Sequence, residues 1–403
     1  MIDNKKSNFI IIAIIAVVVI CVIAFVIIKM TNNKETEQTN SVEENVIVNE
    51  VNEQNAKAKI NSKYFLTLQE AVDSVIEGGT DTKIEILKNI DENIVIPENK
   101  NIALELNNNK IKNQDKTKTT ITVKGNLTIN NGEITSEMMA LVPTILIENN
   151  AKLKLSNTNI SRESAIEYAK ETIGVHGKLD IDSGKISSDN SNSIYTYTER
   201  YVEVNISGTA EITSVDHPAI SNRDQVKINI SGGSIYSENN DSVNNQFGGQ
   251  IIATGGKISS KNGKPVNNYG TFEINGNAEI SSINQPTIYN QSGSSLKIAG
   301  GMVFTKTATT IINQNNAFIE VTGGKISSET GNAINNSGKL KISDGSNISS
   351  NGEQSPTVYN NKDGEVVILG GMIFNSATNY DVYNNGGNVK DENSIVNKKN
   401  WEK

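Results

Sequence analysis

The most regular feature of this chain is an apolar residue that returns every 22 to 26 positions through most of its length. It is the Ile of the motif GGKISS, which occurs at Gly255–Ser260 and Gly323–Ser328 and has looser copies elsewhere. The full series is Ile111, Ile134, Ile160, Ile186, Ile212, Ile235, Ile258, Ile280, Val303, Ile326, Ile348 and Ile373. Each interval contains two or three short alternating runs separated by Gly, Asn or Ser, and no helical period. A repeat of this kind predicts one coil of a parallel β-helix, and 12 copies predict a solenoid of about 12 coils of 22–26 residues.

A second column supports the same register, because the pattern apolar-x-Asn recurs every 22 to 24 residues. Its asparagines are Asn222, Asn245, Asn268, Asn290, Asn313, Asn336, Asn360 and Asn384. Stacked coils place these side chains above one another, where their amides can form a hydrogen-bonded ladder. We therefore interpret this column as structural. We expect a right-handed solenoid, since parallel crossovers are almost always right-handed.

A short helix is predicted just before the repeats, in the stretch FLTLQEAVDSVIEGG (65–79). Thr67 and Glu70 have the spacing of a capping box. One apolar stripe follows, formed by Leu68, Val72, Val75 and Ile76. An isolated amphipathic helix must cover something, so we expect it to cap the open end of the β-structure.

The N-terminal part of the chain has a different pattern. All 20 residues from Phe9 to Ile28 are apolar, which is enough for a transmembrane helix. Lys5 and Lys6 precede it, so the positive-inside tendency puts the N-terminus in the cytoplasm and the rest outside the cell membrane. A cleaved signal peptide is the alternative, but the segment is long and lacks an A-x-A site.

These patterns divide the chain into six parts. They are a cytoplasmic N-terminus (1–8), a transmembrane helix (9–28), an acidic flexible linker (29–59), a capping helix (60–82), the parallel β-helix (83–390) and a C-terminal cap or tail (391–403). The linker has low hydrophobicity and excess negative charge, which favour a solvated tether.

Composition narrows the possible functions. The 403 residues carry a net charge of −8 and show no basic patch, which argues against nucleic-acid binding. The single cysteine, Cys21, lies in the apolar N-terminal run, and there are only two histidines, so disulfides and a Cys/His zinc site are excluded. The glycine pairs precede strands rather than helices, so they do not form a nucleotide-binding phosphate loop.

The stretches TLQEAV (67–72) and IVIPENKNIALELNNNKI (94–111), with the GGxISS coils, resemble the pectin-lyase-like right-handed β-helix, in the form found on bacterial surface proteins. The resemblance covers about residues 64–390. It implies an all-β fold but not one function, because lyases, hydrolases, adhesins and passive stalks share that fold. GVHG (174–177) is similar to one polygalacturonase motif, but the N-T-D, D-D and R-I-K motifs are missing. We therefore expect no catalytic role for His176.

One acidic cluster is a candidate for chemistry. Aligning the outward position of successive coils puts Asp180 next to Glu203, with Asp182 on the same face. Such carboxylates could bind Ca²⁺ or act as an acid/base pair. The simpler interpretation is a repulsion relieved by solvent and by neighbouring lysines. Further along, Glu273, Lys297, Glu320 and Lys341 are predicted to alternate in sign on stacked coils.

The three longest coils, near Ile160, Ile186 and Ile212, also carry extra residues rich in tyrosine. Tyr168, Tyr195, Tyr197 and Tyr201 are predicted to lie beside the acidic cluster, where they could stack on sugar rings or simply pack on strands. Tyr359 and Tyr383 should stack on adjacent coils.

We therefore expect a non-enzymatic, membrane-anchored surface protein that binds a glycan or protein or serves as an envelope stalk, with no cofactor unless Ca²⁺ binds. The alternatives are a polysaccharide lyase or glycoside hydrolase, and a purely structural coat protein.

Overall fold

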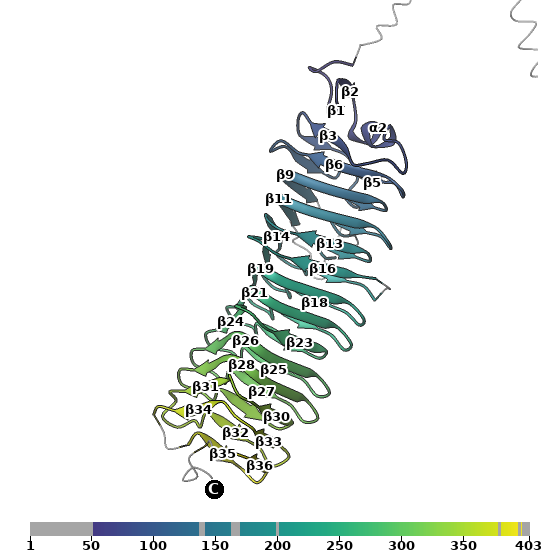
Figure 1. The fold of residues 1–403 in the computed structure, drawn as a ribbon. Helices are drawn as coiled ribbons and strands as arrows, with labels where there is room; N and C mark the ends of the chain where they lie inside the picture. Colours follow the sequence, from purple (N-terminus) through teal and green to yellow (C-terminus); the bar gives the residue numbers. More distant parts are fainter. Residues whose placement is uncertain are drawn as a thin grey trace, which may run out of the picture. The chain divides into compact units, whose positions relative to one another are not determined.

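The computed structural model describes residues 51–136, 142–162, 170–198, 201–377, 380–393 and 396. They form a right-handed parallel β-solenoid of about 13 turns with almost no helix. Figure 1 shows the strands stacked in one elongated column from the strands near residue 60 to those near residue 390. The predicted all-β parallel solenoid is confirmed, with about 13 turns where about 12 were expected.

One face of the solenoid is a sheet of 13 short strands, which all pair in parallel. They are β5 (Ile94–Ile96), β8 (Ile121–Val123), β10 (Ile145–Ile147), β12 (Ile173–Val175), β15 (Ile194–Thr196), β18 (Ile220–Asn222), β20 (Val243–Asn245), β22 (Val266–Asn268), β25 (Ile288–Asn290), β27 (Ile311–Asn313), β29 (Ile334–Asn336), β32 (Val358–Asn360) and β35 (Val382–Asn384). We call this the short-strand sheet. In most of its strands the first and third side chains are buried and the second is partly exposed.

The other two faces belong to a second sheet that bends at a corner in each turn. Its strands are β1 (Ala58–Ile60), β2 (Lys63–Phe65), β3 (Thr82–Ile86), β4 (Ile90–Asp91), β6 (Asn101–Glu105), β7 (Lys110–Lys112), β9 (Asn126–Ser136), β11 (Lys152–Arg162), β13 (Lys178–Ile181), β14 (Lys185–Ser188), β16 (Glu203–Ile206), β17 (Glu211–Ser214), β19 (Lys227–Ser237), β21 (Gln250–Ser260), β23 (Thr271–Ile274), β24 (Glu279–Ser282), β26 (Ser295–Thr305), β28 (Phe318–Ser328), β30 (Lys339–Ile342), β31 (Asn347–Ser350), β33 (Glu365–Ile368), β34 (Met372–Asn375) and β36 (Asn388–Asp391). Where a strand is 11 residues long it continues through the corner, as β21 does.

The apolar residues that recur through the sequence lie in register with one another in this second sheet. The 12 residues from Ile111 to Ile373 form 11 successive pairs between adjacent turns. The column begins one turn earlier than predicted, because Ile90 pairs with Ile111. The interior of the solenoid is one continuous cluster of buried Ile, Val and Leu side chains.

The glycines of GGKISS form the corner. Gly256 has φ +75°, in the left-handed region, and a Cβ there would lie 2.5 Å from the carbonyl oxygen of Gly232 in the preceding turn. Only glycine fits both the conformation and the space. The motif therefore sets the geometry of the turn.

The N-terminal end is capped by helix α2 (Leu68–Asp73) and by β1, which pairs antiparallel with both β2 and β3. The predicted capping box is present, since the Thr67 hydroxyl accepts from the Glu70 amide at 3.1 Å and Glu70 accepts from the Thr67 amide at 3.2 Å. The helix is shorter than the predicted stretch, and Ile76 is 81% exposed rather than part of the buried stripe.

The predicted boundary between the linker and the cap differs from the structure, and the predicted transmembrane helix lies outside the described residues. β1 begins at Ala58, inside the stretch assigned to the linker, and Ala56 is already buried. Within the described part of the chain no helix is long and apolar enough to span a membrane. The predicted transmembrane helix (9–28), most of the linker and most of the predicted C-terminal cap or tail lie outside the described residues.

Candidate functional site

The strongest candidate site lies on the short-strand sheet, where the coils are longest. Tyr195 is the outward residue of β15, and Tyr197 follows that strand at the corner. His176 occupies the same corner one turn earlier, because the amide of Tyr197 donates to the carbonyl of Val175 at 2.9 Å. The parallel register therefore brings these three rings together.

The rings are in direct contact. Those of His176 and Tyr197 stack with their centroids 4.1 Å apart and their planes 7° from parallel. Tyr195 meets Tyr197 edge-on at 4.9 Å. Both arrangements are favourable for aromatic pairs. All three side chains are partly exposed, so the group forms a platform at the surface.

Two cations flank this platform. The Arg223 guanidinium carbon lies 5.2 Å from the centre of the Tyr195 ring. On the other side, Lys170 Nζ is 5.7 Å from the centre of the Tyr197 ring and 3.3 Å from its hydroxyl. Cations at such distances are attracted to the ring faces. We call these five residues, with Glu171, the tyrosine cluster.

Glu171 fixes the orientation of the platform. Its side chain is buried, with 5% of the residue exposed, and its Oε1 accepts a hydrogen bond from the Tyr197 hydroxyl at 2.7 Å. Burial and then the nearby Glu171 carboxylate raise the pKa of Tyr197, so the phenol stays protonated and donates.

Space for Glu171 comes from Gly174, the outward residue of β12. A Cβ at Gly174 would lie 2.7 Å from Glu171 Oε1. The neighbouring turns carry Leu146 and Tyr195 at this position. Gly174 is thus the place where the regular outer column is interrupted so that a carboxylate can fit under the platform.

Arg162 ties the surrounding loops to the solenoid. Its residue is 2% exposed, and Nη1 donates to the carbonyl oxygens of Val142 and Glu171, the latter at 3.3 Å. Burial lowers the pKa of Arg162 to about 10, so the guanidinium remains charged at neutral pH. The residue thereby fixes the backbone that carries Lys170 and Glu171.

The other two predicted tyrosines do not join this group in the described structure. Tyr201 is 76% exposed, has φ +69° and contacts no aromatic ring among the described residues. Tyr168 lies outside the described residues. Lys170, Glu171 and Arg223 were not predicted; the glycine at position 174 was the signal that could have pointed to them.

The predicted stacking of Asp180 on Glu203 is wrong. Asp180 pairs in register with Asn205, and Glu203 pairs with Lys178, a shift of two residues. Both positions face outward in a strand of period two, so the alternation alone did not distinguish them. The structure therefore contains no like-charge pair at these two positions.

Each carboxylate of the predicted cluster has its own partners. Asp180 accepts from Lys152 at 2.9 Å and from Asn205 at 2.8 Å. Although burial raises the pKa of Asp180, these two hydrogen bonds outweigh it and hold the pKa below its usual range. Glu203 lies 3.5 Å from Lys178.

Asp182 accepts from the hydroxyls of Ser156 and Ser183, both at 2.7 Å. Burial raises the pKa of Asp182, but these hydroxyls and the charge of Lys154 lower it further than burial raises it. Across the residues with described positions, no group of three His, Cys, Asp or Glu residues could hold a metal ion. Asp180, Asp182 and Glu203 are thus surface carboxylates, each of which interacts with its own lysine, asparagine or serine neighbours.

Two other predicted columns are present on the surface. Glu273, Lys297, Glu320 and Lys341 pair in register, and the Lys297–Glu273 and Lys341–Glu320 distances are 3.6 and 3.1 Å. Tyr359 and Tyr383 are in contact, with ring centroids 5.3 Å apart.

Seven of the eight asparagines of the apolar-x-Asn pattern, from Asn222 to Asn360, are fully buried inside the solenoid, and Asn384 is partly exposed. The side-chain amide of each, from Asn222 to Asn360, donates to the side-chain oxygen of the next at 2.7 to 2.9 Å. Asn384 ends the ladder. Because these side chains face inward, they contribute to the structure and are not accessible to a ligand.

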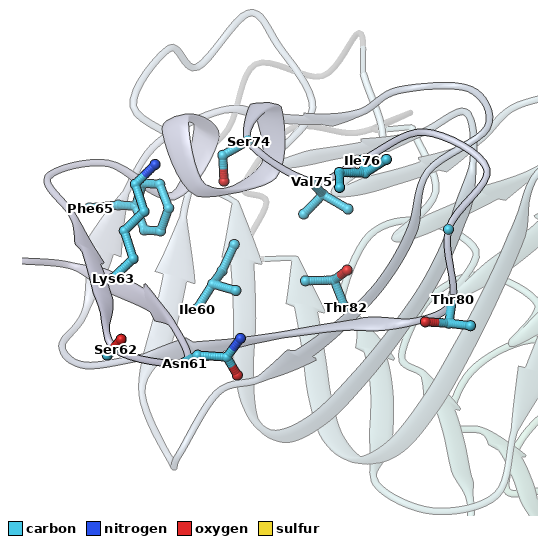
Figure 2. A pocket seen from close by; sticks show the side chains of 11 residues that line it. Ile60, Asn61, Ser62, Lys63, Phe65, Ser74, Val75, Ile76, Thr80 and Thr82 are labelled. Carbon is cyan, nitrogen blue, oxygen red and sulfur yellow. The ribbon is translucent and has the colours of Figure 1, made fainter.

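A pocket of about 500 Å³ lies in the N-terminal cap, between α2 and strands β1 to β3. Figure 2 shows Ile60, Val75 and Thr82 around this space, with Lys63 beside Phe65. The Lys63 ammonium is 4.9 Å from the centre of the Phe65 ring. The described lining combines apolar side chains with serine, threonine, asparagine and lysine, and it contains no carboxylate or histidine.

Comparison with protein-family models, curated proteins and solved structures gives no match for this chain.

Proposed function

We propose that this chain is a cell-surface binding protein whose solenoid presents the tyrosine cluster to a glycan. The observation that carries the proposal is the partly exposed platform of His176, Tyr197 and Tyr195, already stacked and flanked by Lys170 and Arg223. A sugar ring has apolar C–H faces that pack on aromatic rings and hydroxyls that accept hydrogen bonds from cationic side chains.

The size of the cluster favours a glycan over a folded protein partner. A stable protein interface buries about 800 Å² on each partner. The tyrosine cluster offers three rings and two cations, which matches one or two sugar rings. The platform is also fixed in advance by Glu171 and Arg162, so binding orders few side chains.

The rest of the chain fits display at a surface. About 13 turns spaced by about 4.8 Å make a solenoid roughly 60 Å long. In our proposal, residues 9–28 anchor the chain in the cell membrane and the acidic linker holds the solenoid outside. The resemblance to pectin-lyase-like surface proteins supports the same assignment.

A glycan array tests the proposal. Full-length chain in detergent should bind a defined subset of glycans, and the Tyr195→Ala/Tyr197→Ala variant should lose that binding. Tyr359→Ala/Tyr383→Ala is the matched control, because it removes a contacting tyrosine pair from the same sheet. Wild-type chain that binds no glycan, or equal binding by the two variants, would contradict the proposal.

A further inference from the structure

A second hollow lies on the bent sheet, far along the solenoid from the tyrosine cluster. It is bordered by Met302 and Phe304 of β26 on one side and by Phe374 of β34 on the other. The two turns between them carry Lys325 with Ser327 and Asn347 with Ser349 at the same outward positions. We call the space between Phe304 and Phe374, over Ser327 and Ser349, the phenylalanine slot.

The slot has the dimensions of a binding site. Phe304 and Phe374 are three turns apart, which is about 14 Å along the solenoid. The volume is about 460 Å³, within the range of ligand pockets. Its walls remain open to solvent, since Phe374 is 38% exposed and Phe304 is partly exposed.

The fold does not require these apolar side chains. Three of the other eleven turns in this column carry Asp91, Lys112 and Tyr236 at the position of Phe304 and Phe374, and the remaining eight turns carry a small hydroxyl residue there. These residues are Thr135, Ser161, Ser187, Thr213, Ser259, Ser281, Ser327 and Ser349. Neighbouring exposed apolar groups that serve no packing need are typical of interaction sites.

The polar groups of the slot are available for a ligand. The hydroxyls of Ser327 and Ser349 form no hydrogen bond with any described residue. Lys325 at one end of the slot and Glu329 at the other lie in no ion pair among the described residues. By contrast, Lys257, which lies in the same column as Lys325, is 2.9 Å from Glu279.

We propose that the phenylalanine slot is a docking site for an extended peptide segment that inserts an apolar side chain between Phe304 and Phe374. An apolar centre with a charged rim is the usual anatomy of a polypeptide-binding site. The rim presents Lys325 and Glu329, which form no ion pair among the described residues, and a peptide can carry the opposite charge to each, whereas a neutral sugar cannot.

The two rim charges predict the sequence of the peptide. Lys325 and Glu329 are four residues apart, and four residues of extended chain span about 13 Å. In an extended peptide, side chains at positions i, i+2 and i+4 share one face. The preferred peptide therefore carries an acidic and a basic residue four positions apart, with an apolar residue midway between them.

Selection from a phage-displayed library of random linear peptides tests this proposal. The full-length chain in detergent should enrich peptides with the acid-x-apolar-x-base pattern in either direction. Affinity of a synthetic enriched peptide should fall about tenfold or more in Phe304→Ser/Phe374→Ser, which restores the serine of the neighbouring turns. Tyr236→Ser, which replaces an aromatic residue by serine in the same column outside the slot, should leave the affinity unchanged.

A charge variant tests the peptide pattern. Lys325→Glu should abolish selection of the acidic residue, whereas Lys257→Glu in the same column should not. Absence of any enriched pattern, or equal peptide affinity for Phe304→Ser/Phe374→Ser and wild type, would overturn the proposal. Glycan binding that is lost in the same double variant would also overturn it. Because these variants leave the tyrosine cluster intact, the two proposals fail independently.

Discussion

The substitution Asn268→Ala tests how far the internal ladder holds the solenoid together. Asn268 is fully buried. Its amide donates to Asn290 Oδ1 at 2.8 Å and to the carbonyl of Ser295 at 3.0 Å. Its Oδ1 accepts from Asn245 Nδ2 at 2.7 Å and from the amide of Gly270 at 3.2 Å. Alanine removes all four bonds and interrupts the ladder in the middle.

The expected loss follows from these contacts. A buried intramolecular hydrogen bond contributes a net 0.5 to 1.5 kcal/mol, so four bonds amount to about 2–6 kcal/mol of unfolding free energy. The preceding residue, Asn267, is a matched control. It faces outward, and its side-chain oxygen accepts one bond, from Gln291 at 2.8 Å. Asn267→Ala should therefore cost no more than about 1 kcal/mol.

Equilibrium urea unfolding followed by far-ultraviolet circular dichroism measures both changes. Asn268→Ala should lower the urea midpoint clearly more than Asn267→Ala, at an unchanged slope. If the two variants unfold at the same midpoint, the ladder contributes nothing beyond a surface amide, and the reasoning is wrong.

Three further predictions concern the corner, the surface charges and the cap. Gly256→Ala and Gly293→Ala both introduce a side chain at positive φ, but only at position 256 does a carbonyl oxygen lie 2.5 Å from the new Cβ. The melting temperature of the Gly256→Ala variant should therefore fall further than that of the Gly293→Ala variant. Equal shifts would contradict the crowding argument. Because the pKa of Asp180 is lower in the folded than in the unfolded chain, its contribution to stability is present above the unfolded pKa of about 3.9 and is lost as the pH falls. Asp180→Asn should thus destabilise the protein at neutral pH and have little effect near about pH 2, as followed by thermal melting; a pH-independent effect would contradict this. The Glu92 carboxylate accepts a hydrogen bond from the amide of Leu68 at 2.9 Å, at the start of α2. Glu92→Ala should therefore speed amide hydrogen exchange in residues 68–73 and leave exchange in the central turns unchanged. Unchanged protection of the helix amides would show that Glu92 does not hold the helix in place.

The sequence was sufficient to predict the fold because each turn repeats the same constraints. The Ile column must face inward, the corner glycines must adopt positive φ, and the asparagines recur with the same period. Three independent signals therefore define one register. The cap was partly predictable, since the capping box is local, but the antiparallel pairing of β1 with β2 and β3 has no repeat to indicate it.

The outward charges were harder to place. Glu203 and Asp180 each occupy one of two outward positions in a four-residue strand, and polarity is the same at both. Only the pairing of the buried neighbours, Leu179 with Val204, settles which acid faces which lysine. Surface positions carry little information about register because solvent accepts a polar side chain at either one.

Of the tyrosine cluster, only the two tyrosines, Tyr195 and Tyr197, were predicted from the sequence. Tyr195 and Tyr197 were identified because the longest coils carry extra residues that are rich in tyrosine. Lys170 and Glu171 reach the site from an inserted loop, and Arg223 from the following turn. Their contributions depend on the path of the loop, which the repeat pattern does not specify.

The most direct test of the proposed function is a calorimetric titration with the glycan that binds best on the array. The account predicts that wild-type chain and Tyr359→Ala/Tyr383→Ala bind it with the same affinity. It predicts that Tyr195→Ala/Tyr197→Ala, although folded with an unchanged circular dichroism spectrum, binds at least about tenfold more weakly. Unchanged affinity in the folded Tyr195→Ala/Tyr197→Ala variant would contradict the account.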